Sequence, residues 1–238
     1  MQLTENVTPE GKHEEKHFMA PDLIRDIVIG MSDGLTVPFA LAAGLSGSVA
    51  NASLVVIAGM AEIAAGSIAM GLGGYLAART DEEHYESELK REWQEVRELP
   101  HREREEVADI LREWQLPEET VNAAVDSISK DPERWVDFMM KYELGLEKPE
   151  PKRARNSSLT IGISYIIGGI IPLFPYMIIE EAQAALLTSV IVTLIALFVF
   201  GFVKGKFTGS KPLKSAWQTA LVGGAAAGIA FFIAKLIS

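Results

Sequence analysis

Residues 158–179 read SLTIGISYIIGGIIPLFPYMII, and none of these 22 side chains carries a charge. An α-helix needs about 20 apolar residues to cross the hydrocarbon core of a bilayer, which is roughly 30 Å thick. This stretch is therefore long enough to span a membrane. Two more uncharged stretches of similar length follow, residues 182–203 and 215–234. We predict three membrane-spanning helices in this part of the chain.

A fourth apolar stretch lies on the amino-terminal side. Residues 27–78 contain only two charged side chains, Asp33 and Glu62. The stretch is too long for a single crossing of the membrane. The small and polar residues 46–53 predict a turn with a helix on either side. Pro38 lies inside the first of these helices and is expected to kink or break it, because proline lacks the amide hydrogen that an inner helical turn needs. The total is five spans, which places the two chain ends on opposite sides.

A highly charged, acidic segment separates the apolar stretches. Residues 79–147 hold 21 Asp or Glu and 10 Lys or Arg, so their net charge is −11, against −10 for the whole chain. We therefore predict an all-α membrane protein with five transmembrane helices and a cytosolic helical metal-binding insert between spans 2 and 3. The expected parts are an amino-terminal tail (1–21), spans 1 and 2 (22–78), the insert (79–155) and spans 3 to 5 (156–238).

Prolines divide the insert into helices. Residues 82–98 contain neither Gly nor Pro and are expected to extend the second span beyond the membrane. Residues 102–114 form the next expected helix. Two further helices are predicted to begin at prolines, which fit the first helical turn: one at Pro117, and one at Pro132 with Asp131 as its cap.

The distribution of Lys and Arg predicts the orientation, because cytosolic loops are enriched in these residues. The segments before span 1, between spans 2 and 3 and between spans 4 and 5 contain Lys or Arg, whereas the other two turns have neither. We expect the amino terminus and the insert in the cytosol, and the carboxyl terminus on the other side. The basic residues are Lys12, Lys16, Arg25, Lys152, Arg153, Arg155, Lys204, Lys206, Lys211 and Lys214.

Several classes of function are excluded by what the sequence lacks. The chain has no cysteine, which excludes disulfides, thiolate zinc sites, iron–sulfur clusters and cysteine catalysis. It has no Gly-rich loop of the P-loop type, so we do not expect ATP to drive it. The acidic insert would repel nucleic acid. Basic residues that flank the spans, such as Lys152 and Arg153, are expected to set the topology or to contact anionic membrane lipid.

Two carboxylates lie within the predicted spans. A charged side chain at membrane depth costs about 2.5–3.5 kcal/mol or more, so Asp33 and Glu62 are not expected to face lipid. Each is either a packed, protonated or hydrogen-bonded group, or part of an ion path. Met70 lies about two turns beyond Glu62 and can share its face. Carboxylate oxygen with thioether sulfur suits a borderline transition-metal ion better than Na⁺, K⁺ or Mg²⁺, and a desolvated carboxylate can exchange the metal for a proton.

The insert carries carboxylates in pairs three residues apart, and side chains with this spacing share a helix face. Such pairs are common by chance on charged helices, where they are solvated, and Met at helical spacing is more often part of a core. From several helices, however, these side chains could converge on one or more metal ions, as facing carboxylates do in di-iron bundles. The candidate ligands are Glu92, Glu95, Glu103, Glu106, Met139, Met140 and Glu143.

These residues resemble a known family. The run 25–34, RDIVIGMSDG, the stretch 62–74 and the acidic insert together resemble the vacuolar iron transporters, in particular their plant members. Related nodulin-like transporters share the first run but generally lack the insert. The resemblance covers nearly the whole chain.

The resemblance implies a homodimer in the vacuolar membrane that exports cytosolic Fe²⁺ into the vacuole in exchange for protons. It implies an ion path along the dimer interface that includes Asp33, Glu62 and Met70, and it identifies the candidate ligands of the insert with the family's cytosolic metal-binding residues. No prosthetic group is implied, because Fe²⁺ is the substrate and H⁺ the coupling ion. Mn²⁺, Co²⁺ and Zn²⁺ also tolerate carboxylate–thioether sites.

Two other functions are compatible with the residues. The first is a membrane-anchored di-iron oxidase, whose site normally takes Glu-x-x-His from two helices. Within the insert, only Glu98 and His101 have this spacing, and Pro100 interrupts them. The second is a metal sensor whose insert binds metal without transport. The oxidase leaves Asp33 and Glu62 unexplained, and a flux assay separates the sensor from the transporter.

Overall fold

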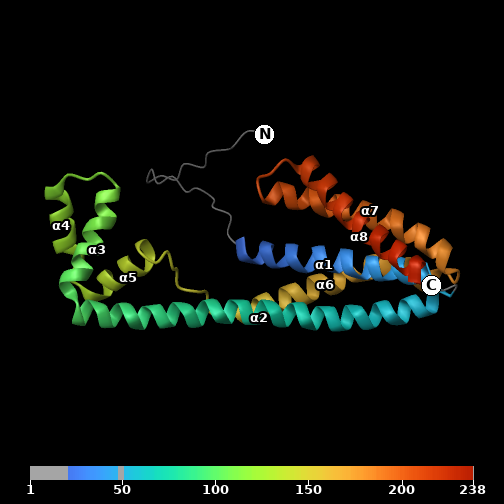
Figure 1. The fold of residues 1–238 in the computed structure, drawn as a ribbon, viewed down its shortest axis with the longest axis horizontal. Helices are drawn as coiled ribbons and strands as arrows, with labels where there is room; N and C mark the ends of the chain where they lie inside the picture. Colours follow the sequence, from blue (N-terminus) through green and yellow to red (C-terminus); the bar gives the residue numbers. More distant parts are fainter. Residues whose placement is uncertain (1–20, 48–50, 238) are drawn as a thin grey trace, which may run out of the picture. The chain divides into compact units, whose positions relative to one another are not determined.

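The computed structural model describes residues 21–47 and 51–237, which contain eight helices and no β-strand (Figure 1). Most of the expected amino-terminal tail, with Lys12 and Lys16, and part of the first turn lie outside the described residues. The helices are α1 (Pro21–Ser46), α2 (Ala52–Glu98), α3 (Pro100–Glu113), α4 (Glu118–Ile128), α5 (Pro132–Tyr142), α6 (Arg153–Ile178), α7 (Ala182–Phe207) and α8 (Pro212–Ile237).

Five of the helices, α1, α2, α6, α7 and α8, are long and apolar enough to cross a membrane. This confirms the prediction of an all-α protein with five candidate spans. α2 is longer than a bilayer requires, because about 20 residues suffice for one crossing. Only its apolar part, residues 52–78, is treated below as membrane-spanning. Residues 79–98 continue the same helix without a break, as the lack of Gly and Pro predicts.

The chain divides into two compact units, which are described separately. The first contains the described residues up to Gly74 and from Ser157 onward, so that α1, α6, α7, α8 and the first part of α2 belong to it. The second comprises Tyr75–Asn156 and is called the inserted unit below.

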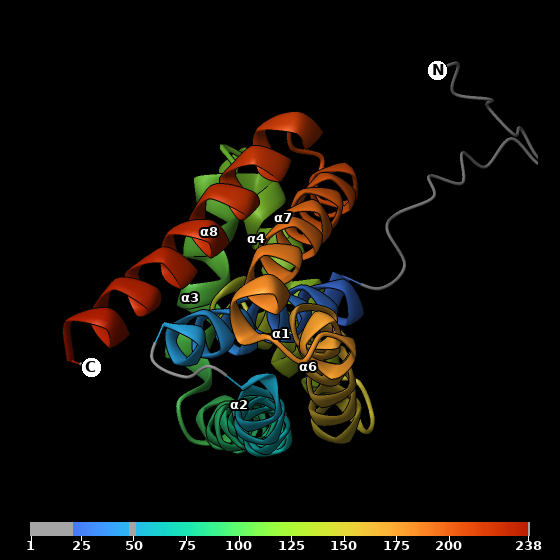
Figure 2. The same cartoon turned by 90° about the vertical axis from the view of Figure 1, so that its right-hand side faces the viewer.

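In the first unit, α1 lies between the α7–α8 pair and the other two helices (Figure 2). Its glycines let α6 come close, because a Cβ atom on Gly30 or Gly34 would lie 2.3 Å from the backbone oxygen of Ile161 or Tyr165, respectively. On its opposite side, α1 packs against α7 and α8 through the buried side chain of Phe39. Close packing thus fixes the helix that carries one of the two intramembrane acids.

Gly34→Ala is expected to destabilise the first unit. The added methyl group would overlap backbone atoms of Tyr165, which cannot turn away as a flexible side chain can. Forced overpacking costs about 1–3 kcal/mol, so the apparent Tm of the detergent-solubilised protein should fall. Heating followed by size-exclusion chromatography measures it. Gly73→Ala is the matched control, because no atom lies within 4 Å of its Cβ position. Equal Tm values for the two variants would contradict this packing.

The prolines of the apolar helices do not break them. Pro38 was expected to kink or break the first span, and α1 continues through it without a break. α6 likewise contains Pro172 and Pro175. Pro38 is buried, and its ring lies against α6 at Gly169. Packing between helices therefore offsets the loss of one backbone hydrogen bond.

The inserted unit is built from residues 75–98 of α2 together with α3, α4 and α5. Its hydrophobic core includes both candidate methionines. Asp131 caps α5 as predicted, and its side chain accepts a hydrogen bond of 3.1 Å from the amide of Glu133. α4 begins one residue later than predicted, so Pro117 is its N-cap and not part of its first turn.

Candidate functional site

Three carboxylates converge in the inserted unit. Glu92 comes from α2, Glu103 from the first turn of α3, and Glu143 follows the end of α5. One oxygen atom from each lies within 4.8 Å of the other two. Separate chain segments thus bring together groups that repel one another when ionised. Buried charges in proteins are normally paired or coordinate a metal ion.

Two of the three carboxylates are almost completely buried. The side chains of Glu92 and Glu103 are 1% and 2% exposed, whereas Glu143 is exposed. One oxygen of Glu92 and one of Glu103 are buried without a hydrogen-bond partner. A buried polar atom without a partner costs roughly 1–3 kcal/mol, and more when it is charged. Two such atoms in one cluster are unfavourable for stability and are typical of a functional site.

Burial raises the pKa of Glu92 and that of Glu103 to about 7. The neighbouring carboxylates act in the same direction, led by Glu143 for Glu92 and by Glu106 for Glu103. Burial also raises the pKa of Glu143, with Glu106 and Glu95 adding to the effect. The cluster therefore exchanges protons near neutral pH, where a divalent cation would compete with them.

Glu95 and Glu106 lie at the edge of the cluster and have cationic partners. The carboxylate of Glu95 is 3.6 Å from the guanidinium of Arg91, and that of Glu106 is 3.0 Å from Arg102. Arg91 also approaches Glu92, at 3.9 Å. The structure thus brings the second member of each predicted pair near the site without including it in the group of three.

Met139 and Met140 lie on α5 and are 0% and 2% exposed. They precede Glu143 by four and three residues, which is the spacing of one helical turn. Both pack in the hydrophobic core of the inserted unit. A role for their sulfur atoms as metal ligands stays a prediction.

The metal-free inserted unit is expected to lose stability as the pH rises through 7. Glu92 and Glu103 have a pKa of about 7 when folded, above the ordinary value of 4.5. Between pH 4.5 and pH 7, the folded state therefore binds more protons than the unfolded state. The stability that these protons contribute is fully present below pH 4.5 and is lost as the pH rises through 7. We expect the Tm to fall by about 10 °C between pH 5 and pH 8 in a chelator.

Tryptophan fluorescence can report this transition in the intact chain once Trp217 is replaced by Phe. Glu92→Gln/Glu103→Gln should lack most of the pH dependence, because the amides do not titrate in this range. A dependence of unchanged size in that double variant would show that other groups cause it. The three tryptophans that remain all lie in the inserted unit: Trp93, Trp114 and Trp135.

In the first unit, the three predicted path residues lie on α1 and α2 and are half-buried. Glu62 accepts a hydrogen bond from the hydroxyl of Tyr165 on α6. Its other oxygen is buried without a hydrogen-bond partner. Asp33 lies close enough to Tyr165 for an electrostatic interaction. Both acids therefore lie near one tyrosine, while Met70 lies about two turns farther along α2.

Tyr165 is a residue that the sequence reasoning missed. It is 2% exposed and stands in the uncharged run with which the sequence analysis began. A buried tyrosine hydroxyl usually has a hydrogen-bond partner, so a tyrosine within a span was a usable signal. The identity of the partner was not predictable, because Tyr165 and Glu62 are 103 residues apart in the chain.

The sequence matches known proteins over nearly its whole length. The profile of the VIT family matches residues 24–235. Vacuolar iron transporter 1 from Arabidopsis thaliana is 56% identical over 225 residues, which cover 94% of this chain and 90% of that protein. The protein of the same name from Tulipa gesneriana is 54% identical over 234 residues, covering 98% and 94%. Protein CCC1 from Saccharomyces cerevisiae is 40% identical over 225 residues, covering 91% and 70%. This chain therefore belongs to the VIT family, the family of the vacuolar iron transporters.

Proposed function

We propose that this protein is a homodimeric antiporter of the vacuolar membrane that moves cytosolic Fe²⁺ into the vacuole in exchange for protons. The amino terminus and the inserted unit face the cytosol, the inserted unit captures the metal, and the carboxyl terminus is lumenal. Relatives that are 53–57% identical and are named vacuolar iron transporters support the substrate and the membrane. The observation that carries the proposal is the pair of buried carboxylates, Glu92 and Glu103, each with an unpartnered oxygen.

The chemistry of the carboxylate cluster suits capture of a divalent ion from a neutral compartment. Its three carboxylates offer oxygen ligands and compensating negative charge. Because the pKa of Glu92 and that of Glu103 are about 7, metal binding releases protons and is weakened by acid. Carboxylates alone do not select iron, so Mn²⁺, Co²⁺ and Zn²⁺ are expected to compete.

The first unit supplies the elements of a path. Asp33 and Glu62 are half-buried carboxylates near Tyr165, and Met70 adds a thioether on the same helix as Glu62. A carboxylate shielded from water can hold either a metal ion or a proton, so the same groups can carry Fe²⁺ in one direction and H⁺ in the other. The unpartnered oxygen of Glu62 is free to take part in this exchange.

An apolar stripe on α2 supports the homodimer. Its members recur at intervals of three or four residues along the membrane-spanning part of the helix, and all are exposed. The small residues among them would let a second helix approach closely. We infer that the stripe meets its own copy in a second chain. The residues are Ile57, Met60, Ala61, Ala64, Ala65, Ile68 and Leu72.

A metal sensor without transport is the second candidate, because every member of the carboxylate cluster lies in the inserted unit. Metal could therefore bind there without crossing the membrane. The di-iron oxidase lacks comparable support. Among the described residues, Glu98 and His101 form the only Glu-x-x-His pair, and both are exposed and outside the cluster.

Fe²⁺ uptake into proteoliposomes tests the proposal. The purified protein is reconstituted with a metal-sensitive dye and a pH dye inside, and Fe²⁺ is added outside under reducing, anaerobic conditions. We expect lumenal Fe²⁺ to rise while the lumen becomes more alkaline, because protons leave as iron enters. Binding of Fe²⁺ without uptake would support the sensor and contradict the transporter. In a separate aerobic assay, Fe²⁺-dependent consumption of O₂ without uptake would indicate the oxidase.

A further inference from the structure

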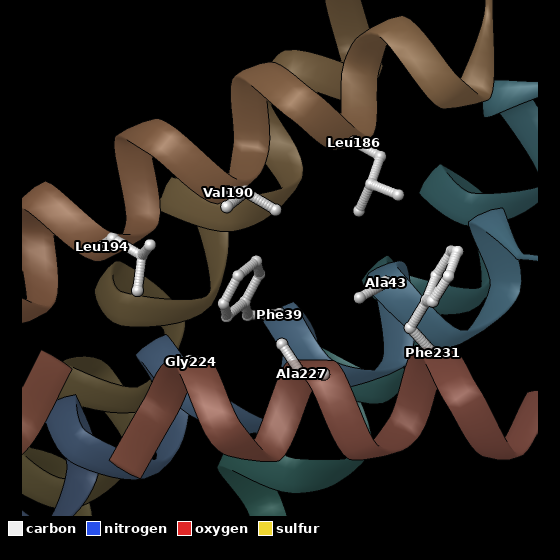
Figure 3. A pocket seen from close by; sticks show the side chains of 9 residues that line it. Phe39, Ala43, Leu186, Val190, Leu194, Gly224, Ala227 and Phe231 are labelled. Atoms are coloured by element: carbon white, nitrogen blue, oxygen red, sulfur yellow. The ribbon is translucent and has the colours of Figure 1, made fainter. Parts of the chain in front are cut away.

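A cavity of about 250 Å³ lies between α1, α7 and α8 in the first unit (Figure 3). All of the residues that line it are apolar. On α7, the side chains of Leu186, Val190 and Leu194 follow one another at single-turn intervals and point toward α8. On the α1 side, the aromatic ring of Phe39 lines the cavity and is only 1% exposed. The cavity is thus a slot without hydrogen-bonding side chains.

The slot exists because α8 has very small residues where it faces α7. Residues 223–228 read GGAAAG. No atom lies within 4 Å of the position that a Cβ would take on Gly228, and only Leu194 approaches that of Gly224, at 3.2 Å. Along residues 223–228, the large side chains of α7 therefore meet no α8 side chain of matching size, and Phe231 is the one large residue of α8 that lines the slot.

Water is a poor occupant of this slot, because a buried water needs two to four polar partners. Empty space of this size is also unfavourable in a packed protein. The slot lies among candidate membrane spans, and its neighbours on the outer faces of α7 and α8, such as Leu187, Ile191 and Ile229, are more than half exposed. The medium next to the slot is therefore lipid.

The position of the slot along α7 indicates which part of a lipid molecule lies next to it. Leu186 and Leu194 lie about 6 Å and 18 Å from the start of α7, counted from Ala182 at 1.5 Å per residue. The whole helix is about 39 Å long by the same rise. The slot therefore lies at the depth of the acyl chains of one leaflet, away from the headgroups.

We propose that the slot binds an acyl chain of one membrane phospholipid, which stays with the protein and completes the packing of α8 against α1 and α7. A flexible aliphatic chain can adapt to a narrow slot that three helices line, and the apolar lining provides no other basis for recognition. The lipid thereby supports α1, the helix that carries Asp33.

Photo-crosslinking of the reconstituted protein tests the proposal. The protein is placed in phosphatidylcholine with a diazirine near the end of one acyl chain, extracted into detergent, washed and irradiated. We expect native mass spectrometry to show a retained phospholipid, and fragmentation to assign crosslinks to Leu194 and its neighbours in the slot. Residues on the outer faces, such as Leu187 and Ile229, should give no crosslinks, because their lipid is washed away before irradiation.

Gly228→Leu fills the slot and should lose both the retained lipid and the crosslinks. Leucine favours a helix more than glycine does, so the variant should fold, and its elution volume and Trp217 emission check this. Ala225→Leu is the matched control, because it adds a larger side chain on the exposed side of α8. Leu186→Ala, which widens the slot, should keep the lipid.

Three results would overturn the proposal. The first is equal lipid retention, or equal absence of lipid, in Gly228→Leu and in the wild type. The second is crosslinking confined to residues on the outer faces. The third is crosslinking between protein chains at a photoreactive residue introduced at position 228, which would assign the slot to a second copy of this chain.

Discussion

Replacing Glu92 and Glu103 together by glutamine is expected to abolish high-affinity Fe²⁺ binding by the inserted unit and to make the metal-free unit more stable. Both side chains are almost fully buried, each with one unpartnered oxygen, and neighbouring carboxylates repel them. Neutral amides of the same shape remove that repulsion. Loss of an outer-shell partner weakens metal binding about 10–100-fold, so loss of two direct ligands should weaken it at least about 100-fold. Gain of stability with loss of binding is typical of a site kept for function.

An anaerobic Fe²⁺ titration, followed by tryptophan fluorescence in the Trp217→Phe background, measures the binding. Thermal unfolding in a chelator measures the stability. Glu83→Gln/Glu86→Gln is the matched control, because these exposed carboxylates lie on the same helix with the same spacing as a predicted pair. The control should bind Fe²⁺ as the parent does. Unchanged affinity in the Glu92/Glu103 variant, or lower stability without metal, would refute the assignment of these two side chains as ligands.

We expect Asp33→Ala to abolish Fe²⁺ uptake into proteoliposomes and to leave Fe²⁺ binding by the inserted unit unchanged. A carboxylate within a span costs about 2.5–3.5 kcal/mol or more, so such a residue is retained for a function. Asp33 lies near the Tyr165 hydroxyl that is bound to Glu62, and its removal takes away one of the two carboxylates that the proposed path can offer to a cation. Uptake should therefore fall to the level of protein-free liposomes.

Two further variants separate charge from shape at this position. Asp33→Asn keeps the shape but not the charge, and we expect it to be as inactive as Asp33→Ala. Asp81→Ala makes the same substitution at an exposed position of α2 outside its apolar part, and it should transport normally. Uptake by Asp33→Ala at the wild-type rate would remove Asp33 from the path. Loss of metal binding in that variant would indicate misfolding rather than a blocked path.

Local chemistry made most of the fold predictable from the sequence. Uncharged runs of about 20 residues predict spans, because a helix satisfies its own backbone hydrogen bonds in lipid. Asp131 before Pro132 predicts a helix start, because its side chain can accept a hydrogen bond from a free amide of the first turn. Pro38 shows the limit of such reasoning. Its local effect favours a break, but packing against α6 keeps the helix continuous.

The candidate site was predictable only in part. The spacing of three residues places Glu92 with Glu95, and Glu103 with Glu106, on a shared face, but it does not tell which member of each pair faces the site. The structure buries the first member of each pair and leaves the second beside an arginine. The packing of α2, α3 and α5 in the inserted unit decides this. In the first unit, the packing of α6 against α2 likewise decides that Tyr165 bonds to Glu62, which lies 103 residues away in the chain. Spacing along one helix contains no information on either.

The initial rate of Fe²⁺ uptake as a function of external Fe²⁺ concentration tests most directly whether the inserted unit collects ions and the first unit conducts them. Wild type, Glu92→Gln/Glu103→Gln and Asp33→Ala are compared in the same proteoliposome preparation. We predict that the double variant needs a higher Fe²⁺ concentration for half-maximal uptake but reaches a similar maximal rate, and that Asp33→Ala shows no uptake at any concentration. Uptake by Asp33→Ala, or an unchanged concentration dependence in the double variant, would contradict this division of roles.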